Sequence, residues 1–543
     1  MRFSTISANS LAILFISLAS IATAPGQTAK AKLNPNEPLE KYNMPPAYIY
    51  RLGTSPRMIS PYGVFISYQV NVDAQGNNIL GDAANEPSIA VDPTNGNKMT
   101  IGWRQFNSVQ SDFRQGGWGY TTDAGVTWTF PGVLENNVFR SDPVLDSDDT
   151  GNFSYLSLRE TFYDDIWRSI NGGASWTRLT FGDVSGGDKQ WFTIDRTNGT
   201  GHGFQYQLWS TSGNNFGGRQ FSRSTDNGAT WMSPIFLPNS PVWGTLDVDS
   251  NGNLFIGGAA NFTSPFWCLR SSNAQNPAIT PTFDRVTQVD LGGSLDFSDT
   301  INPGGLAGQV FLAVDRSGGP TNNNVYMVAS VQPSGFGTGT DVMFVRSTDG
   351  GLTFSAPHRI NDDPINHNKW HWFGTLAVAP NGRIDSVWLD SRNAANNTDS
   401  QLFYSFSTDG GVTWAPNVAV SAAFTPFEGY PVQNKIGDYI TIVSDNTGGN
   451  VAYPATFNFN PSSSQHEQDV YFVRVSPTGG PTPTPTATAT ATPTATATAT
   501  ATPTATATAS STPSATPTIT PRPTPTPRSA PTVRPRPTPR PRP

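Results

Sequence analysis

The chain has 543 residues and a formal net charge of −7, from 33 basic and 40 acidic residues. Only 13% of the residues are charged, 11% are aromatic, and glycine and proline are abundant. This profile is typical of an all-β domain with many turns, and it argues against a coiled coil or a nucleic-acid binder. The single cysteine, Cys268, excludes an internal disulfide and belongs to no Cys/His cluster, so we expect a buried and inert thiol.

The first 24 residues have the pattern of a secretory signal peptide. Arg2 precedes an apolar run over 11–21, and residues 22–24 read Ala-Thr-Ala. The apolar run is too short to span a bilayer as a helix. We therefore predict an exported protein, secreted or held at the cell surface, in which residues 25–44 form a linker before the folded domain.

Seven hairpin patterns follow along the chain. Each joins an apolar strand, through an Asp-rich or Gly/Asn-rich turn, to a second apolar strand; they occur at 85–103, 141–158, 188–209, 242–259, 308–331, 371–390 and 437–457. A third and a fourth strand follow most of them, and four antiparallel strands at this spacing are typical of a propeller blade. We predict an all-β propeller over residues 45–478 with seven blades, and six blades are the alternative.

The last blade lacks a fourth strand of its own. Its third strand reads DVYFVRVS (469–476), and the composition changes soon afterwards. The segment GVFISYQVN (63–71), which precedes the first hairpin, can supply the missing strand. Because this pairing would close the ring and remove two exposed sheet edges, we expect strands from both ends of the domain to share one blade.

Residues 479–543 consist of Pro-Thr and Ala-Thr repeats. Such a segment has too little apolar surface to fold, so we predict a disordered tail. Its final part contains six arginines and no acidic residue, and removing these six charges from the total of −7 leaves −13 for the rest. Two interpretations stay open, namely a stalk that binds an anionic cell-envelope polymer and a solvated linker.

A short turn recurs between the expected third and fourth strands. It reads TTDAGVTW (121–128), SINGGASW (169–176), STDNGATW (224–231), STDGGLTF (347–354) and STDGGVTW (407–414), with a blurred copy at 270–283. The Asp or Asn can accept hydrogen bonds from backbone N–H groups, and the Gly tolerates a positive φ. We expect the closing aromatic ring to pack within its own blade. Each residue of the turn thus has a structural role.

These turns resemble Asp-boxes, also called bacterial neuraminidase repeats, and the chain over 45–478 is similar to the sialidase superfamily. The resemblance implies a propeller whose active site lies on the face where the innermost strands begin, opposite the recurring turns. A sialidase-like site would hold three arginines for a carboxylate, a Tyr nucleophile assisted by Glu, and an Asp acid/base. The family's Arg-Ile-Pro motif is absent, and the nearest text is YRLGTSPR (50–57).

Starts of first strands and ends of second strands share this face, which selects the candidate residues. Acid/base and nucleophile candidates are Glu86, Asp142, Asp438, Tyr430 and Tyr439. Candidates for binding an anionic sugar are Arg104, Arg159 and Arg392, and candidates for stacking on sugar rings are Trp191, Trp243 and Trp372. Alternatively, the arginines pair with neighbouring acids, Arg159 with Glu160 and Arg392 with Asp390, and hold the blades together.

Two further patterns are weaker. DSDDTGN (146–152) has part of a calcium-loop spacing, although an ordinary turn explains it better. His367 and His371 lie beside two tryptophans, and packing explains them better than metal binding. We expect no metal, no cofactor and no nucleic-acid partner. Two hypotheses follow: a monomeric propeller that acts on or binds glycans, with glycoside hydrolase activity, and a non-catalytic cell-surface scaffold.

Overall fold

The computed structural model describes residues 40, 42–46, 53–179, 185–260 and 263–477. The predicted signal peptide, most of the predicted linker and the tail at 479–543 lie outside the described residues. Within these ranges no helix is long and apolar enough to cross a bilayer. The strands run from Thr54 to Val475, which is inside the predicted domain.

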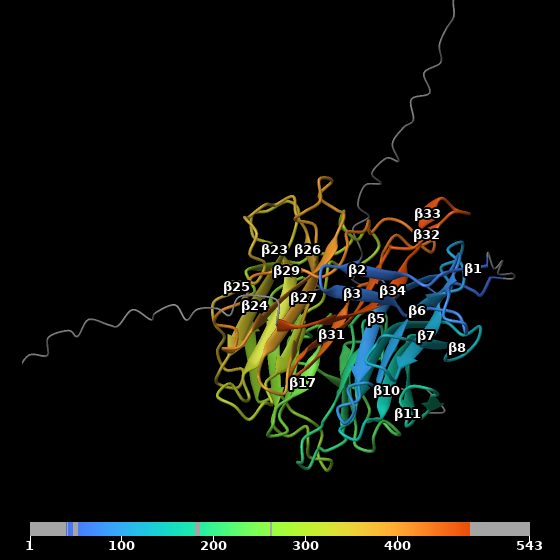
Figure 1. Cartoon of the computed structure of the whole chain (residues 1–543). Helices are drawn as coiled ribbons and strands as arrows, with labels where there is room; N and C mark the ends of the chain where they lie inside the picture. The colour runs from blue at the N-terminus through green and yellow to red at the C-terminus, as the bar shows by residue number, and fades with distance from the viewer. Residues whose placement is uncertain (1–39, 41, 47–52, 180–184, 261–262, 478–543) are drawn as a thin grey trace, which may run out of the picture. The chain divides into compact units, whose positions relative to one another are not determined.

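The described residues form a β-propeller of seven antiparallel blades, as the repeats predicted (Figure 1). Blades 1 to 3 consist of β5 (Ala83–Val91), β6 (Met99–Phe106), β7 (Gln115–Thr121) and β8 (Thr129–Val133); β9 (Arg140–Ser147), β10 (Phe153–Arg159), β11 (Asp164–Ser169) and β12 (Thr177–Arg178); and β13 (Trp191–Ile194), β14 (Gln205–Leu208), β15 (Arg219–Ser224) and β16 (Ile235–Phe236).

Blades 4 to 6 repeat this order. They consist of β17 (Leu246–Val248), β18 (Leu254–Ala259), β19 (Phe266–Ser271) and β20 (Arg285–Val289); β22 (Phe311–Val314), β23 (Val325–Pro333), β24 (Asp341–Ser347) and β25 (His358–Arg359), with β21 (Gly293–Leu295) also paired to β23; and β26 (His371–Val378), β27 (Ile384–Asp390), β28 (Gln401–Ser407) and β29 (Val418–Ala419).

Blade 7 joins the two ends of the domain. Its strands β30 (Thr441–Asp445), β31 (Gly448–Ala455) and β34 (Asp469–Val475) come from the C-terminal part, and β3 (Phe65–Gln69) and β2 (Ile59–Tyr62) come from the N-terminal part. Ser67 lies opposite Val473 in the β3–β34 pair, which Figure 1 shows side by side. The predicted closure by residues 63–71 is therefore confirmed. Two short pairs, β1 (Thr54–Ser55) with β4 (Asn78–Ile79) and β32 (Phe459–Asn460) with β33 (Gln465–His466), lie outside the blades.

Side chains of the innermost strands link neighbouring blades. The hydroxyl of Ser88 accepts a hydrogen bond from the backbone of Leu145 in blade 2, at 2.9 Å. Thr441 of blade 7 likewise accepts from Ile89 at 3.0 Å, and Thr245 of blade 4 accepts from Leu312 at 2.7 Å. Inner strands of adjacent blades form no continuous sheet, so these bonds satisfy backbone N–H groups that burial would otherwise leave unpaired.

The recurring turn has the geometry expected from its residues. Asp349 accepts hydrogen bonds from the Ser347 hydroxyl at 2.7 Å and from the Thr353 backbone and hydroxyl at 2.9 and 2.6 Å. Burial opposes ionisation, but these bonds lower the pKa of Asp349 to about 2. Gly350 and Gly351 have φ of 69° and 81°, so their backbone favours glycine. Both carboxylate oxygens of Asp349 are therefore used in hydrogen bonds within the turn, which is a structural role.

The closing aromatic residues also contact the neighbouring blade, which was not predicted. Trp128 of blade 1 lies 5.5 Å from the ring of Phe472 in blade 7, and Trp414 of blade 6 lies 5.1 Å from Phe344 in blade 5. Only Trp176 of this group contacts an aromatic ring of its own blade among the described pairs. The turns therefore stabilise contacts between successive blades, because a large aromatic ring contributes much apolar contact area.

The single cysteine is a core residue, as predicted. Cys268 lies in β19 and is 1% exposed. Burial raises the pKa of its thiol to about 12, so the reactive thiolate is strongly disfavoured.

Candidate functional site

The innermost strands begin with a left-handed residue in five of the seven blades. These residues are Glu86, Asp142, Lys189, Trp243 and Phe373, with φ between 48° and 58°. Non-glycine residues seldom adopt this conformation, and it is costly for bulky ones. In blades 1, 2 and 6 the strand pairing shifts register at this point, which marks a bulge. Because the feature recurs around the ring, it belongs to the architecture, and it directs the side chains at these positions.

Charged side chains from blades 1, 2, 3 and 7 meet at this end of the ring. We call them the funnel cluster, defined by Glu40, Glu86, Arg104, Arg114, Asp142, Asp188, Lys189, Lys435 and Asp438. Each is at most 2% exposed. Burial at this level is rare for charged residues unless they are paired, so the cluster depends on its internal ion pairs.

Two lysines lie at the centre of the funnel cluster. Lys435 Nζ is 2.7 Å from Asp438, 2.8 Å from Glu40 and 3.3 Å from Glu86. Lys189 Nζ of blade 3 lies 2.5 Å from Asp438 of blade 7. Each ammonium group thus joins carboxylates from elements far apart in the sequence.

Lys189 also lies near both carboxylates of blades 2 and 3. Its Nζ is 3.8 Å from Asp142 and 3.7 Å from Asp188. The backbone N–H of Lys189 donates to Asp142 at 2.9 Å. On the other side, Arg104 Nε is 3.1 Å from Glu86 and donates to the amide oxygen of Asn85 at 2.9 Å.

The carboxylates of the cluster fall into two groups by pKa. Burial raises the pKa of Glu86 to about 7, although Arg104 and Lys435 act in the opposite direction. Burial also raises the pKa of Asp188 to about 7, against the effect of Lys189. For Asp142 and Asp438 burial acts upward too, but Lys189 and Lys435 outweigh it and hold both pKa values below the usual range. The site therefore combines proton-holding and ionised carboxylates at neutral pH.

Two groups of three carboxylates could hold a metal by distance alone. Oxygens of Glu40, Glu86 and Asp438 lie within 4.8 Å of one another, as do those of Glu40, Asp142 and Asp188. The ammonium groups of Lys189 and Lys435 contact these same carboxylates. Since lysine provides the positive charge at both places, the residues fit internal ion pairing better than cation binding.

Tyr439 and Trp191 lie next to the cluster. The Tyr439 hydroxyl donates a hydrogen bond to the backbone oxygen of Pro143 at 2.7 Å. Burial first, and then the carboxylates of Glu86 and Asp142, raise the pKa of Tyr439 well above its usual value. The Trp191 ring packs edge-on against Tyr439, with ring centres 5.2 Å apart. In this state Tyr439 fixes blade 7 to blade 2.

Three other predicted residues lie apart from these contacts. Trp243 packs edge-on against Phe297 and is 1% exposed, and Trp372 donates from its indole nitrogen to Ser400 at 3.0 Å and is fully buried. Neither ring has a face available for a sugar in this structure. The Tyr430 hydroxyl has no hydrogen-bond partner among the described residues. The roles proposed for these three residues remain predictions.

The three predicted arginines belong to three different charge groups. Arg104 is part of the funnel cluster. Arg159 Nε lies 3.4 Å from Asp165 in its own blade. Arg392 donates to Asp390 within its own blade, at 2.8 Å. The structure therefore brings Arg104, but neither of the others, to the cluster, and the pairing of Arg392 with Asp390 is the alternative stated from the sequence.

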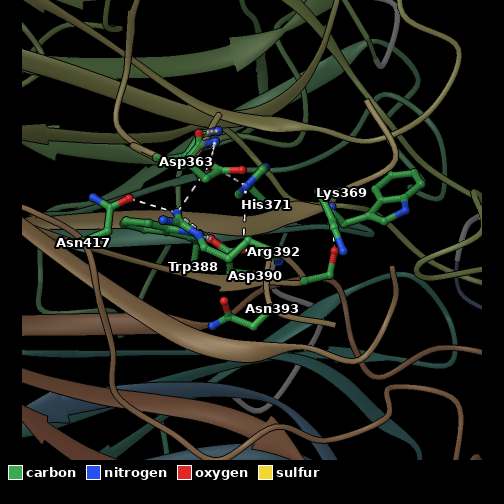
Figure 2. A network of polar contacts seen from close by, with 12 residues as sticks. Asp363, Lys369, His371, Trp388, Asp390, Arg392, Asn393 and Asn417 are labelled. Atoms are coloured by element: carbon green, nitrogen blue, oxygen red, sulfur yellow. Dashed lines mark hydrogen bonds and ion pairs between the residues drawn. The ribbon is translucent and has the colours of Figure 1, made fainter. Parts of the chain in front are cut away.

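Arg392 belongs to a polar network between blades 5 and 6 (Figure 2). Besides Asp390, its guanidinium contacts Asp362 at 2.7 Å. His371 lies between Asp363 and Asp390, with Nε2 at 3.0 and 3.6 Å from their carboxylate oxygens, while Nδ1 is 2.6 Å from the Thr340 backbone oxygen. Burial acts downward on the pKa of His371, but both carboxylates outweigh it and raise the pKa. These contacts hold two blades together.

The segment with partial calcium-loop spacing forms an ordinary turn. Asp148 accepts hydrogen bonds from the backbones of Thr150 and Asn152 at 3.0 and 2.9 Å. Asp249 forms the same bonds at the corresponding turn of blade 4. Since the carboxylate oxygens accept hydrogen bonds within the turn, the segment has the ordinary turn that the sequence favoured.

Below the cluster, the innermost strands surround a central cavity of about 510 Å³. Its lining includes Trp191 and Phe311 and extends to Asp92 and Pro93 at the turns of the opposite face. Arg196 pairs with Asp146 at this lining. No residue of the funnel cluster lines the cavity, so the two features are separate within the described part of the chain.

Asp188 and Lys189 lie where an inner strand was expected to begin on the predicted face, but sequence reasoning missed three other members of the cluster. Arg114 precedes β7, Lys435 precedes β30, and Glu40 lies in the predicted linker. Arg114 and Lys435 follow loops whose conformation the repeat does not specify. Lys435 lies three residues before Asp438, and this spacing near the start of an inner strand was the available signal. Glu40 has none, because it lies outside the repeats.

No family model matches the chain, and no curated protein matches it. Among solved structures, a protein of unknown function from Dyadobacter fermentans is 15% identical with a TM-score of 0.41, covering 75% of this chain and 98% of its own. The phage phi92 endosialidase is 10% identical with a TM-score of 0.43, covering 79% and 71%. The GH93 α-L-arabinofuranosidase of Fusarium graminearum is 12% identical with a TM-score of 0.37, covering 78% and 98%.

Proposed function

We propose that this protein is an exported, glycan-directed propeller that takes an acidic sugar at the funnel cluster. The observation that carries the proposal is that Arg104 lies 3.1 Å from Glu86, whose carboxylate in turn lies within 4.8 Å of Asp438. A cation for a sugar carboxylate lies there beside two carboxylates with opposite pKa shifts. General acid–base chemistry requires such a pair, with one group protonated and the other ionised near neutral pH.

In this proposal Glu86 is the proton donor and Asp438 the ionised partner. Their carboxylate oxygens lie within 4.8 Å of each other. Burial raises the pKa of Glu86 to about 7, so it retains a proton that a leaving glycosidic oxygen could accept. The lysines hold Asp438 ionised, which suits it to stabilise developing positive charge on a sugar ring. Asp142, held ionised by Lys189, is an equivalent candidate on the other side.

A non-catalytic binding or scaffolding propeller is the second candidate, and one observation favours it. Every charged group of the cluster is at most 2% exposed in this structure. A site that acts on a glycan must admit one, and a fully packed cluster instead ties four blades together. Under this alternative, ligand binding would use another surface, and the cluster would serve stability alone.

The test compares binding and cleavage in one set of proteins. The wild-type chain and Glu40→Ala would be titrated with D-glucuronate, sialic acid and neutral glucose, and incubated with the matching aryl glycosides. The Glu40 variant is included because the Glu40 carboxylate contacts Arg104 and Lys435, the cations to which an acidic sugar would bind. We expect acidic sugars to bind and neutral glucose to bind far less.

Two substitutions separate the alternatives. Arg104→Ala would abolish binding of the acidic sugar, whereas Arg392→Ala, which removes a cation paired within blades 5 and 6, would leave it unchanged. Glu86→Gln would retain binding but abolish cleavage. If neither wild type nor Glu40→Ala binds or cleaves any sugar of the panel, the scaffold proposal replaces the glycan proposal.

A further inference from the structure

Glu40 is a buried charge from a segment that lies outside the propeller repeats. Its side chain is 1% exposed, although it belongs to the predicted linker and to no strand. The carboxylate contacts four cations: Arg104 Nη1 at 3.2 Å, Lys435 Nζ at 2.8 Å, Lys189 Nζ at 3.5 Å, and Arg114 Nη2. A carboxylate held by two arginines and two lysines has the coordination of a bound ligand rather than of a surface ion pair.

The two carboxylate oxygens of Glu40 have different partners. Oε1 faces Arg104, Lys189 and Lys435, and Oε2 faces Arg114. The Nη2 atom of Arg104 is buried and has no hydrogen-bond partner among the described residues, so this site has an additional donor to offer. The cations therefore form a receptor that contacts both oxygens of a carboxylate, assembled from blades 1, 3 and 7.

The contacts of the four cations show why the receptor needs an anion. The cations also face four other carboxylates, Glu86, Asp142, Asp188 and Asp438, and Arg114 pairs with Asp112 at 2.6 Å. Among the described residues, however, Glu40 alone contacts Arg104, Arg114, Lys189 and Lys435 together. Removing it would leave buried charged donors without this partner, which is costly, and one carboxylate at the position of Glu40 restores it.

The same four carboxylates select the kind of anion. They surround the receptor, and a dianion would meet stronger repulsion from them than a monoanion would. A carboxylate, which is planar and carries one charge, matches the group that occupies the receptor. Phosphate, which carries more negative charge near neutral pH, matches it less well.

Residues 42 and 43, which follow Glu40 in the described part of the chain, also contact the propeller. The Tyr42 ring packs edge-on against Phe139 at 5.4 Å, and Asn43 donates to Asp112 at 2.8 Å. Tyr42 is 42% exposed and Met44 is 71% exposed. No strand is present at 40 or 42–46, so releasing this segment breaks no sheet. Within residues 40 and 42–46, a buried Glu40 carboxylate is thus followed by exposed residues that belong to no strand.

We propose that Arg104, Arg114, Lys189 and Lys435 form a carboxylate-binding site, and that Glu40 is an internal ligand that occupies it in competition with external carboxylates. The identity of the external ligand as an acidic sugar rests on the proposed function above. The receptor itself does not, because any small carboxylate can report on it. When Glu40 is displaced, an external carboxylate can bind to the four cations. When Glu40 is bound, its own carboxylate pairs with these cations and excludes the external ligand.

The experiment uses the full chain with Glu40→Ala and Glu40→Gln, and acetate as the probe. Acetate replaces the lost carboxylate, so we expect it to raise the melting temperature of both variants and to bind Glu40→Ala at least about tenfold more tightly than wild type, because an internal competitor reduces apparent affinity. Glu40→Gln keeps the shape of the side chain and guards against misfolding of Glu40→Ala.

Glu135→Ala is the matched control. Glu135 also pairs with two arginines, Arg140 and Arg178, but its side chain is 28% exposed, so water replaces it and acetate should have no effect. Equal acetate responses in wild type, Glu40→Ala and Glu135→Ala would overturn the proposal. Tighter binding of inorganic phosphate than of acetate would overturn the carboxylate class.

The same titrations separate this inference from the proposed function. If Glu40→Ala binds acetate but no sugar of the panel, the receptor exists and the glycan proposal fails. If both proteins bind D-glucuronate with equal affinity, the glycan proposal stands and the internal-ligand role of Glu40 fails.

Discussion

Glu86→Gln is expected to remove one specific pH dependence of folding stability. Glu86 is fully buried beside Arg104 and Lys435, and burial raises its pKa from 4.5 to about 7. A folded-state pKa above the unfolded value means that the folded chain binds the proton more tightly. The stabilising contribution is therefore complete below pH 4.5 and is lost as the pH rises to about 7.

The size of this effect follows from the shift. Each pKa unit corresponds to about 1.4 kcal/mol, so Glu86 accounts for a loss of about 3 kcal/mol between pH 4.5 and 7. Glutamine resembles the protonated glutamic acid but cannot ionise. The two proteins should therefore have similar stability near pH 4.5, and the variant should exceed wild type by about 3 kcal/mol above pH 7.

Urea unfolding at pH 4.5, 5.5, 6.5 and 7.5, at constant ionic strength, measures this difference. The pKa values of Asp188 and Asp469 are also raised to about 7, but these residues titrate in both proteins and cancel from the comparison. Asp409→Asn is the control, because the pKa of Asp409 is lowered and its effect appears only in more acidic solution. A free-energy difference between Glu86→Gln and wild type that is constant across this range would refute the reasoning.

Three further predictions concern stability. In Gly411→Ala the new Cβ would lie 2.3 Å from Phe344. The control is Gly335→Ala, which also has a positive φ but whose new Cβ has no atom within 4 Å. We expect urea unfolding to show that Gly411→Ala loses about 1–3 kcal/mol more stability than Gly335→Ala, and equal losses would contradict this. Asp349→Ala should cost about 1–3 kcal/mol by the same measurement and leave acetate binding in the Glu40→Ala background unchanged. The pKa of His371 is raised, so its stabilisation is present below pH 6.5 and is lost at higher pH; the deficit of His371→Gln should therefore be larger at pH 5.5 than at pH 8.5, and an equal deficit at both would exclude a charged His371.

The fold was predictable because its signals are local and repeated. Each recurring turn specifies its own hydrogen bonds through one Asp or Asn and one Gly, as at Asp349 and Gly351. Seven hairpins with the same order are typical of a propeller ring, and residues 63–71 join the open edge of the last blade. The packing of Trp128 and Trp414 on the preceding blade was not predictable, since the sequence of one blade does not state the tilt of its neighbour.

The candidate site was predictable only in part. The structure places Glu86, Asp142, Asp438 and Arg104 in one cluster, because the chain direction decides which end of each strand lies at the shared face. Arg114 and Lys435 come from loops, and Glu40 comes from outside the repeats. No periodicity constrains such residues, so only the folded structure identifies them.

Register explains why Arg104 reaches the cluster and Arg159 does not. Arg104 lies opposite Asn85, one residue before the left-handed Glu86, whereas Arg159 lies opposite Arg140, two residues before the left-handed Asp142. Successive residues of a strand point to opposite sides, so a displacement of one residue reverses the direction of a side chain. In the sequence pattern both arginines lie at the end of a second strand. That pattern does not define the strand register to within one residue.

The same backbone position serves two purposes around the ring, and this limits inference from position alone. The left-handed residue is charged in blades 1 to 3, as Glu86, Asp142 and Lys189, but it is Trp243 in blade 4 and Phe373 in blade 6. The charged residues face one another and need partners, whereas the two aromatic residues fill the core between blades. Trp243, whose sugar-stacking role remains a prediction, is buried in this structure, and burial of its apolar ring is favourable. The side chain's chemistry, and not its place in the repeat, decides between site and core.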